Sequence, residues 1–370
     1  MESQIHKIHQ QLVSKEITCL LLVQERLRLL KTNKHATVNS LLEKSALELA
    51  KKVDAKIASG QKIGLLEGIP FGIKDVYMLQ GTYTSASSNF LKKYKSPYTA
   101  TAIQKLIDAG AIPIVKENCD SFGHGSSSEN TIFGAVKNAI NPALVGGGSS
   151  GGSAVNVAKD LTVFSIGGDT GGSVRQPAGY NKVYGLKPTY GRISRFGLMA
   201  YASSTDCVGP IAKSIEDIRI VFNEISGKDT KDQTTYSSEK ISKEAISTAS
   251  EIKTVGYFKN FLETDVIDPK IKLDFFATID KIKEKGIAVK ALDFFEPDTL
   301  VSTYYTLAMA ETASNLSRLD GTNYGHRIEG DTLKDTYSIT RSENFSEETK
   351  RRIGGGNQVL SKGLSDEIYY

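Results

Sequence analysis

The sequence lacks most of the features that identify a disulfide-rich, zinc-binding or membrane protein. Its 370 residues contain no tryptophan and three cysteines, Cys19, Cys119 and Cys207. These cysteines are far apart and form no C-x-x-C motif, which argues against a disulfide framework or a zinc site. No apolar run approaches the roughly 20 residues of a membrane span, and residues 1–11 are too polar for a secretory signal. We therefore expect a cytoplasmic location and no membrane partner.

The charge pattern does not indicate a nucleic-acid-binding protein. The chain has 46 basic and 42 acidic residues, which leaves a formal charge of +4, and the two signs are interspersed. Without a basic stripe, this chain alone is not expected to provide the main nucleic-acid-binding surface, and no DNA partner is expected. It also has no P-loop and no H-E-x-x-H motif. We therefore expect no metal and no other cofactor in this chain.

Apolar periodicity predicts a layered α/β fold with a mixed sheet. Helical spacing over residues 2–31 and 41–57 indicates an N-terminal helical layer within 1–58, with Ser14 as an N-cap between two helices. Strands and helices then alternate, which is typical of a layered α/β architecture. Helices are predicted at 100–109, 214–224, 269–285, 304–316 and 346–361, and strands at 65–76, 111–115, 161–166, 254–257 and 287–295. The hydrophilic residues 227–253 are expected to form a surface excursion.

The remainder of the chain is organised around the stretch from Gly146 to Gly191. Two Gly-Ser clusters in it are joined by a helix-like run and a strand-like run. Such composition usually indicates a flexible linker, but a linker would not contain these apolar runs or the Arg-Gln-Pro turn that follows. Glycine is better explained here by close approach of the backbone to other groups, or by positive φ, around hydroxyls held in place.

A single lysine, Lys74, follows the apolar run LLEGIPFGI. Two interpretations of this lysine stay open. It could extend its ammonium group to solvent at the edge of the run. Alternatively, it could be buried, in which case loss of hydration lowers the pKa. A drop of roughly 3 units from the usual value of about 10.4 would make it an effective base near neutral pH.

The serines of the two clusters could carry out nucleophilic catalysis in two ways. Residues 147–151 match the G-x-S-x-G nucleophile elbow, but only His326 follows as a histidine and no clear strand precedes the motif. The other solution has no histidine: a neutral Lys74 accepts a proton from Ser149, and Ser149 accepts one from the nucleophile Ser173. Backbone N–H groups of the turn Thr170, Gly171 and Gly172 would then stabilise an oxyanion.

At these residues the chain resembles the amidase signature family. The matching motifs are GIPFGIKD at 68–75, GGSSGGSA at 147–154, DTGGSVRQP at 169–177 and GLKPTYGRISRFGL at 185–198. The resemblance implies that Lys74 is the base, that Ser149 is a bridging serine in a cis-peptide-linked position, and that Ser173 forms the acyl-enzyme. It also implies one catalytic domain over 1–370, with its Lys-Ser-Ser core at 60–220 and the remainder of the fold at 254–370.

Within this family the chain is most similar to the A subunits of glutamyl-tRNA(Gln)/aspartyl-tRNA(Asn) amidotransferases. The similarity is carried by residues 125–134, 187–210, 311–321 and 348–353. It implies that Tyr304 helps to hold glutamine and that Arg352 binds the substrate's α-carboxylate, although the neighbouring Tyr305 and Arg351 leave the register open. Ser128, in the loop at 125–134, is assigned to substrate binding on the same ground.

The same resemblance implies a heteromeric complex. The B subunit is expected to bind tRNA and to carry ATP and Mg²⁺, and the C subunit is expected to clamp the pair. The chain departs from the family pattern at Gly146, where proline is common, and at the glycines 354–356. The family pattern also continues beyond residue 370 with an aspartate for the substrate's α-amino group, so the fold is expected to be incomplete at the C-terminus. A freestanding amidase and an inactive scaffold remain alternatives.

Overall fold

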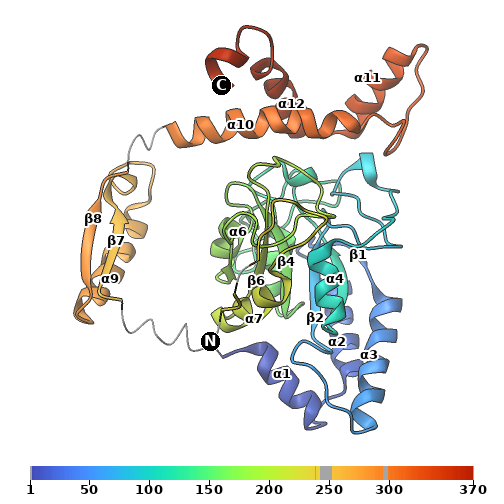
Figure 1. Ribbon diagram of the computed structural model, residues 1–370, viewed down its shortest axis with the longest axis vertical. Coiled ribbons are helices and arrows are strands. Elements are labelled where there is room, and N and C mark those ends of the chain that lie inside the picture. The colour runs from blue at the N-terminus through green and yellow to red at the C-terminus, as the bar shows by residue number, and fades with distance from the viewer. Residues whose placement is uncertain (1, 238, 242–251, 295–298, 370) are drawn as a thin grey trace. The chain divides into compact units, whose positions relative to one another are not determined.

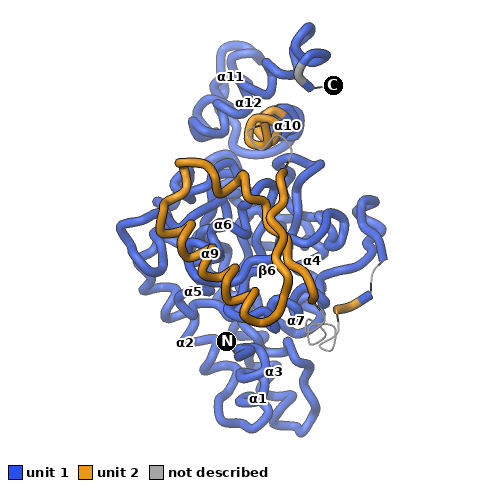
Figure 2. The backbone as a smooth tube through the Cα atoms, turned by 90° about the vertical axis from the view of Figure 1, so that its left-hand side faces the viewer, with its two compact units in different colours: residues 1–239, 307–370 blue, residues 240–306 orange. Residues whose placement is uncertain are grey.

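The computed structural model describes residues 2–237, 239–241, 252–294 and 299–369. They form two compact units (Figure 2). The first comprises Met1–Glu239 and Leu307–Tyr370, and the second comprises Lys240–Thr306. The sequence predicted one catalytic domain over 1–370 without this division. A separate two-stranded sheet within residues 240–306 is the physical reason for it. That both units belong to one catalytic domain stays a prediction.

The first unit is built on a six-stranded mixed sheet with the strand order β1-β3-β2-β4-β6-β5. Strand β2 is parallel to both of its neighbours, β3 and β4, whereas the β1–β3, β4–β6 and β5–β6 pairs are antiparallel. The strands are β1 (Val38–Leu41), β2 (Pro70–Lys74), β3 (Ile112–Glu117), β4 (Phe164–Asp169), β5 (Tyr184–Gly185) and β6 (Cys207–Ala212). This mixed sheet confirms the predicted α/β class.

Helices pack against the sheet on both of its faces, because apolar side chains alternate along the strands. Phe164 and Ile166 of β4 belong to the main core, whereas Ile211 of β6, opposite Ser165, belongs to a smaller core with helices α5 and α6. Figure 1 shows these elements around the sheet. The helices of this region are α1 (Gln4–Val13), α2 (Cys19–Thr32), α3 (Glu43–Ala58), α4 (Thr101–Asp108), α5 (Gly151–Ala158), α6 (Arg175–Tyr180) and α7 (Ile215–Ile225).

A buried carboxyl group lies among the three central strands. Glu117, the last residue of β3, is fully buried and accepts hydrogen bonds from Asn156 (3.0 Å) and Ser165 (2.8 Å). Gly72 of β2 provides the space for it, since a Cβ atom there would lie 1.9 Å from the Glu117 Oε1 atom. Burial raises the pKa of Glu117 to about 7. The middle of the sheet therefore contains a polar network that is fitted around a glycine.

The second unit contains β7 (Thr254–Phe258), α9 (Pro269–Glu284) and β8 (Ala288–Leu292). The two strands are parallel and are joined by the helix, which is an ordinary β-α-β connection. Asp268 caps α9 by accepting the N–H of Lys270. Helix α10 (Thr299–Asn315) begins in this unit and ends in the first, which also contains α11 (Leu333–Asn344) and α12 (Glu347–Val359).

Most predicted elements are present, with shifts at their ends. Strand β2 is shorter than the predicted range 65–76, and strand β4 begins and ends later than the predicted range 161–166. The pattern at 41–57 covers the end of β1 as well as helix α3. Ser14 was predicted wrongly as an N-cap: it ends α1, and Thr18 caps α2 by accepting the N–H of Leu21. Of the predicted excursion at 227–253, residues 238 and 242–251 lie outside the described residues.

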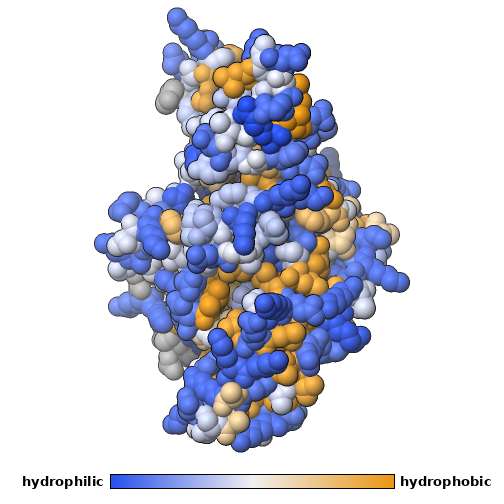
Figure 3. Space-filling view, turned by 90° about the vertical axis from the view of Figure 1, so that its right-hand side faces the viewer, coloured by the Kyte–Doolittle hydropathy of each residue, from blue (hydrophilic) through white to orange (hydrophobic). Residues whose placement is uncertain are grey.

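The surface carries mostly hydrophilic residues with smaller apolar patches between them on the face drawn in Figure 3. Among the described residues, no helix combines the length and the apolar character needed to cross a membrane.

Candidate active site

Lys74 occupies the end of β2, where the strand places it below the surface. Its side chain is 2% exposed, which decides between the two open interpretations in favour of burial. Its Nζ atom donates a hydrogen bond to the Oγ atom of Ser149 at 2.6 Å and lies 3.4 Å from the carbonyl oxygen of Gly168. Burial lowers the pKa of Lys74, while Cys119 and the carboxylates of Asp120, Asp169 and Asp206 partly oppose this shift. A lysine in this environment can serve as a proton acceptor.

A second buried lysine lies on the neighbouring strand. Lys116 of β3 forms an ion pair with Asp75 (3.0 Å), and both side chains are almost fully buried. Lys116 also donates to the carbonyl oxygen of Tyr77 and to the Oγ1 atom of Thr84. By contrast, Lys74 has no carboxylate within ion-pair distance among the described residues. The two lysines therefore differ in their counter-ions although they are equally buried.

The backbone of the first Gly-Ser cluster is held in position from several sides. The Gly148–Ser149 peptide bond is cis, as the resemblance implied. The N–H of Asp120 donates to the carbonyl oxygen of Ser149 at 3.2 Å, and α5 begins two residues later at Gly151. A Cβ atom at Gly148 would lie 2.2 Å from the Asp120 carboxylate. This confirms that glycine is required here by close backbone approach, so the flexible-linker interpretation is wrong.

The second cluster forms a turn around the carboxylate of Asp169. This carboxylate, at the end of β4, accepts the N–H groups of Gly172 (2.7 Å) and Val174 (3.0 Å) and pairs with the Arg175 guanidinium. Burial alone would raise the pKa of Asp169, but Arg175 and the backbone donors hold it below its usual value. Asp169 therefore fixes the turn that carries Ser173, whose own carbonyl oxygen accepts the Ser150 N–H at 3.0 Å.

The three predicted oxyanion donors are not equivalent in the structure. Thr170 lines a small cavity together with Lys74 and Ser149. The N–H group of Gly172, in contrast, is already engaged by Asp169. Of the predicted set, Thr170 is the residue that lines the cavity beside Lys74 and Ser149, and the role of all three stays a prediction. The cavity itself measures about 20 Å³, which suffices for about one water.

The structure distinguishes Arg352 from Arg351. Arg352 of α12 is 5% exposed, and its Nη1 atom donates to the Tyr201 hydroxyl at 2.5 Å, while its Nε atom donates to Glu348. Arg351 also pairs with Glu348, but its side chain is 60% exposed. Because Tyr201 lines the same cavity as Lys74 and Ser149, Arg352 is the arginine that is connected to the site.

The other two predicted substrate-binding residues lie in different settings. Ser128 is fully buried, and its Oγ atom accepts the N–H of Gly151 and donates to the Ser149 carbonyl oxygen at 3.5 Å. It therefore supports the serine backbone. Tyr304 lies in the second unit, in helix α10, where its ring packs against that of Tyr305. Substrate binding by either residue stays a prediction.

Several residues near Lys74 were missed in the sequence. Asp206 lines the cavity and accepts the N–H groups of Tyr201 and Ala202. Burial raises its pKa to about 7, and burial likewise raises the pKa of Asp120 to about 6. His124 packs its ring 4.3 Å from that of Tyr201, and burial lowers its pKa to about 3. The positions of the two aspartates in the sequence could have indicated them, because Asp120 closely follows strand β3 and Asp206 immediately precedes β6.

Comparison with known proteins identifies the family of the chain. The family model described as Amidase matches residues 21–370. The chain belongs to the amidase family. It is 41% identical to the A subunit of the glutamyl-tRNA(Gln) amidotransferase of Gloeothece citriformis, over 99% of this chain and 76% of that protein. It is 42% identical to the protein of the same name from Heliobacterium modesticaldum, over 98% of this chain and 75% of that protein.

Two solved structures have a fold similar to that of this chain. The A subunit of the glutamyl-tRNA(Gln) amidotransferase of Thermotoga maritima matches with 31% identity and a TM-score of 0.72, over 93% of this chain and 76% of that one. The peptide amidase of Stenotrophomonas maltophilia, at 24% identity, matches with a TM-score of 0.80 over 100% of this chain and 77% of that one. The latter likeness concerns the fold alone.

Proposed function

We propose that this chain is the glutamine-hydrolysing A subunit of a tRNA-dependent amidotransferase. The observation that carries the chemistry is the buried hydrogen bond between Lys74 and Ser149, beside a turn that holds Ser173. The choice of glutamine is supported by the relatives named as A subunits of glutamyl-tRNA(Gln) amidotransferases, which are about two-fifths identical over nearly the whole chain. The substrate amide is the side-chain carboxamide of glutamine.

The proposed reaction proceeds through an acyl-enzyme. Neutral Lys74 accepts the proton of Ser149, and Ser149 accepts that of Ser173 as the Ser173 Oγ atom forms a bond to the amide carbon. The carbonyl oxygen becomes an oxyanion facing the turn at Thr170 and Gly171. When the C–N bond breaks, the nitrogen receives the proton and leaves as ammonia. A water then attacks the acyl carbon and gives a proton to Ser149, which passes its own to Lys74. The proton then returns through Ser149 to the Ser173 oxygen as the acyl bond breaks, which releases glutamate and restores Ser173.

The remaining tasks of an amidotransferase are assigned to partners. Attaching ammonia to a tRNA-linked carboxylate requires activation of that carboxylate by ATP and Mg²⁺. The tRNA must also be bound, mainly through its phosphates. This chain has neither a P-loop nor a basic stripe. We therefore assign ATP, Mg²⁺ and tRNA to the B subunit, the clamping role to the C subunit, and the complex to the cytoplasm. Glu-tRNA(Gln) and Asp-tRNA(Asn) are both candidate acceptors.

The test is to measure ammonia release from glutamine by the chain alone and after addition of the B and C subunits, charged tRNA and ATP. The proposal expects slow release by the isolated chain and a clear rise with the full set. Asparagine and simple primary amides serve as comparison substrates. If the isolated chain hydrolyses simple amides rapidly and no partner changes that rate, a freestanding amidase replaces the proposal. If no amide is hydrolysed in any mixture, the inactive-scaffold alternative stands.

A further inference from the structure

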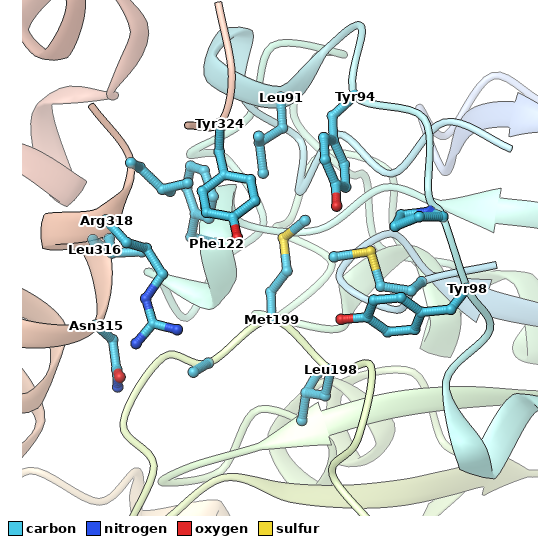
Figure 4. Close-up of a pocket in the computed structure, with 14 residues that line it drawn as sticks. Leu91, Tyr94, Tyr98, Phe122, Leu198, Met199, Asn315, Leu316, Arg318 and Tyr324 are labelled. Carbon is cyan, nitrogen blue, oxygen red and sulfur yellow. The ribbon is translucent and has the colours of Figure 1, made fainter. Parts of the chain in front are cut away.

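A second and larger cavity lies next to the Lys74–Ser149 cavity in the first unit. It measures about 320 Å³, which falls at the lower end of the range for small-molecule sites. Phe122, Leu198 and Met199 line both cavities and so form the partition between them. Figure 4 shows the larger cavity with Met199 near its centre. Its contents would therefore contact the same side chains as a molecule bound beside Lys74.

The walls of this larger cavity are mainly apolar, and three tyrosines stand among the apolar side chains. Tyr94 and Tyr98 lie in the segment before α4, and Tyr324 lies in the segment before α11. Tyr94 meets Tyr324 edge to face at 6.5 Å between centroids. Their hydroxyl groups have no hydrogen-bond partner among the described residues, and Figure 4 shows the three side chains directed toward the cavity. Flat rings suit the faces and edges of another ring, and the free hydroxyls can donate to an acceptor atom.

One cation lies at the rim. Arg318 is exposed, and within the described parts of the chain its guanidinium forms no ion pair and no hydrogen bond. The nearest acidic residue in sequence, Asp320, has its carboxylate engaged by the N–H groups of Thr322 and Asn323. A guanidinium is suited to bind a carboxylate with two parallel hydrogen bonds. An apolar cavity with tyrosine rings in its walls and a cation at its rim therefore matches a ligand that has a ring at one end and a negative charge at the other.

We propose that this cavity binds a small aromatic carboxylate, with its ring between Tyr94, Tyr98 and Tyr324 and its carboxylate on Arg318. The volume corresponds to roughly ten waters, which is enough for one ring with a short side chain. The bound ring contacts Phe122, Leu198 and Met199, which also line the Lys74–Ser149 cavity. This proposal does not depend on which amide the enzyme hydrolyses.

Binding is tested with 3-phenylpropanoate as the probe, by ligand-observed NMR titration of the full chain. Two matched probes separate the contributions: 3-phenylpropanol keeps the ring without the charge, and propanoate keeps the charge without the ring. The proposal expects 3-phenylpropanoate to bind at least about fivefold more tightly than either. Equal affinity for the alcohol, or no binding of 3-phenylpropanoate at millimolar concentration, would overturn it.

Variants locate the site. Arg318→Gln is expected to weaken 3-phenylpropanoate binding by at least about fivefold, and Tyr324→Ala by a similar factor. Lys334→Gln is the matched control, because Lys334 is an exposed cation outside the cavity and its loss should leave binding unchanged. Circular dichroism confirms that each variant is folded. Undiminished binding in folded Arg318→Gln, or equal weakening in Lys334→Gln, would show that the probe binds elsewhere and contradict the proposal.

Discussion

The Lys74 Nζ atom lies 2.6 Å from the Ser149 Oγ atom, and both side chains are nearly inaccessible to solvent. If this hydrogen bond begins the proton relay, replacing Lys74 removes the base. Lys74→Ala should lower the rate of glutamine hydrolysis by about 100- to 10,000-fold. His326→Ala should have almost no effect, because His326 is an exposed residue with no place in the relay. Similar losses in both variants, measured as kcat/KM, would contradict a lysine mechanism.

The pH dependence of the same reaction provides an independent check on Lys74. Only the neutral amine can accept a proton, so activity should fall on the acid side as Lys74 becomes protonated. Because burial lowers the pKa of Lys74, that fall should occur below the usual lysine value of about 10.4. A rate profile of kcat/KM against pH measures it. An acid limb at the pKa of an ordinary solvent-exposed lysine would be inconsistent with the buried position acting as the base.

Ser173 is expected to carry the acyl group. Ser173→Ala should abolish glutamine hydrolysis while changing the free energy of unfolding by about 1 kcal/mol or less, since only one hydroxyl is lost. Mass spectrometry of the enzyme treated with a glutamine analogue that reacts with serine should locate the adduct in the peptide containing Ser173. An adduct on Ser149 or Ser150 instead would support the nucleophile elbow and exclude the proposed relay.

The adjacent residues Arg351 and Arg352 allow a controlled test of substrate binding. Arg352 is buried against Tyr201 and Glu348, whereas Arg351 is exposed. If Arg352 recognises the substrate's α-carboxylate, Arg352→Gln should raise the KM for glutamine about tenfold or more, and Arg351→Gln should leave it nearly unchanged. A purely structural role predicts a different result: Arg352→Gln would lower the thermal midpoint and kcat, with the KM for glutamine unaltered.

The buried Glu117 should make stability depend on pH. Its pKa is about 7 when folded, above the ordinary value of 4.5, so the folded state holds a proton that the unfolded state has lost. The contribution of this group to stability is complete below pH 4.5 and is lost as the pH rises to about 7. A pKa shift of this size corresponds to a loss of about 3 kcal/mol in the free energy of unfolding. Urea unfolding at several pH values should show this decline, and Glu117→Gln should flatten it.

A Glu117→Gln variant with the same pH dependence as the wild type would assign the decline to other groups. Burial also raises the pKa of Asp206 to about 7 and the pKa of Asp120 to about 6. Asp206→Asn and Asp120→Asn therefore serve as the comparison variants in this series.

The sequence predicted the fold class correctly because it depends on local patterns, and the same patterns provided the catalytic candidates, whose roles stay predictions. Helix α9 matches its predicted range within a residue, since Asp268 and Pro269 form a strong helix start. The burial of Lys74 could not be predicted, because it depends on strands that are far away in the sequence. The same reason explains why Asp206 and the link from Arg352 to Tyr201 were missed. Contacts across 151 residues, such as that link, leave no periodic signal.

The ion pair between Asp75 and Lys116 has a consequence for the chemistry of its neighbour. Asp75 directly follows Lys74, yet its carboxylate lies against the amine of the adjacent strand. Burial lowers the pKa of both lysines, but the carboxylate counteracts this shift at Lys116. Of these two interior amines, Lys116 has the carboxylate of Asp75 within ion-pair distance, which favours its charged form. The charge balance at the ends of β2 and β3 therefore depends on where the carboxylates lie as well as on depth of burial.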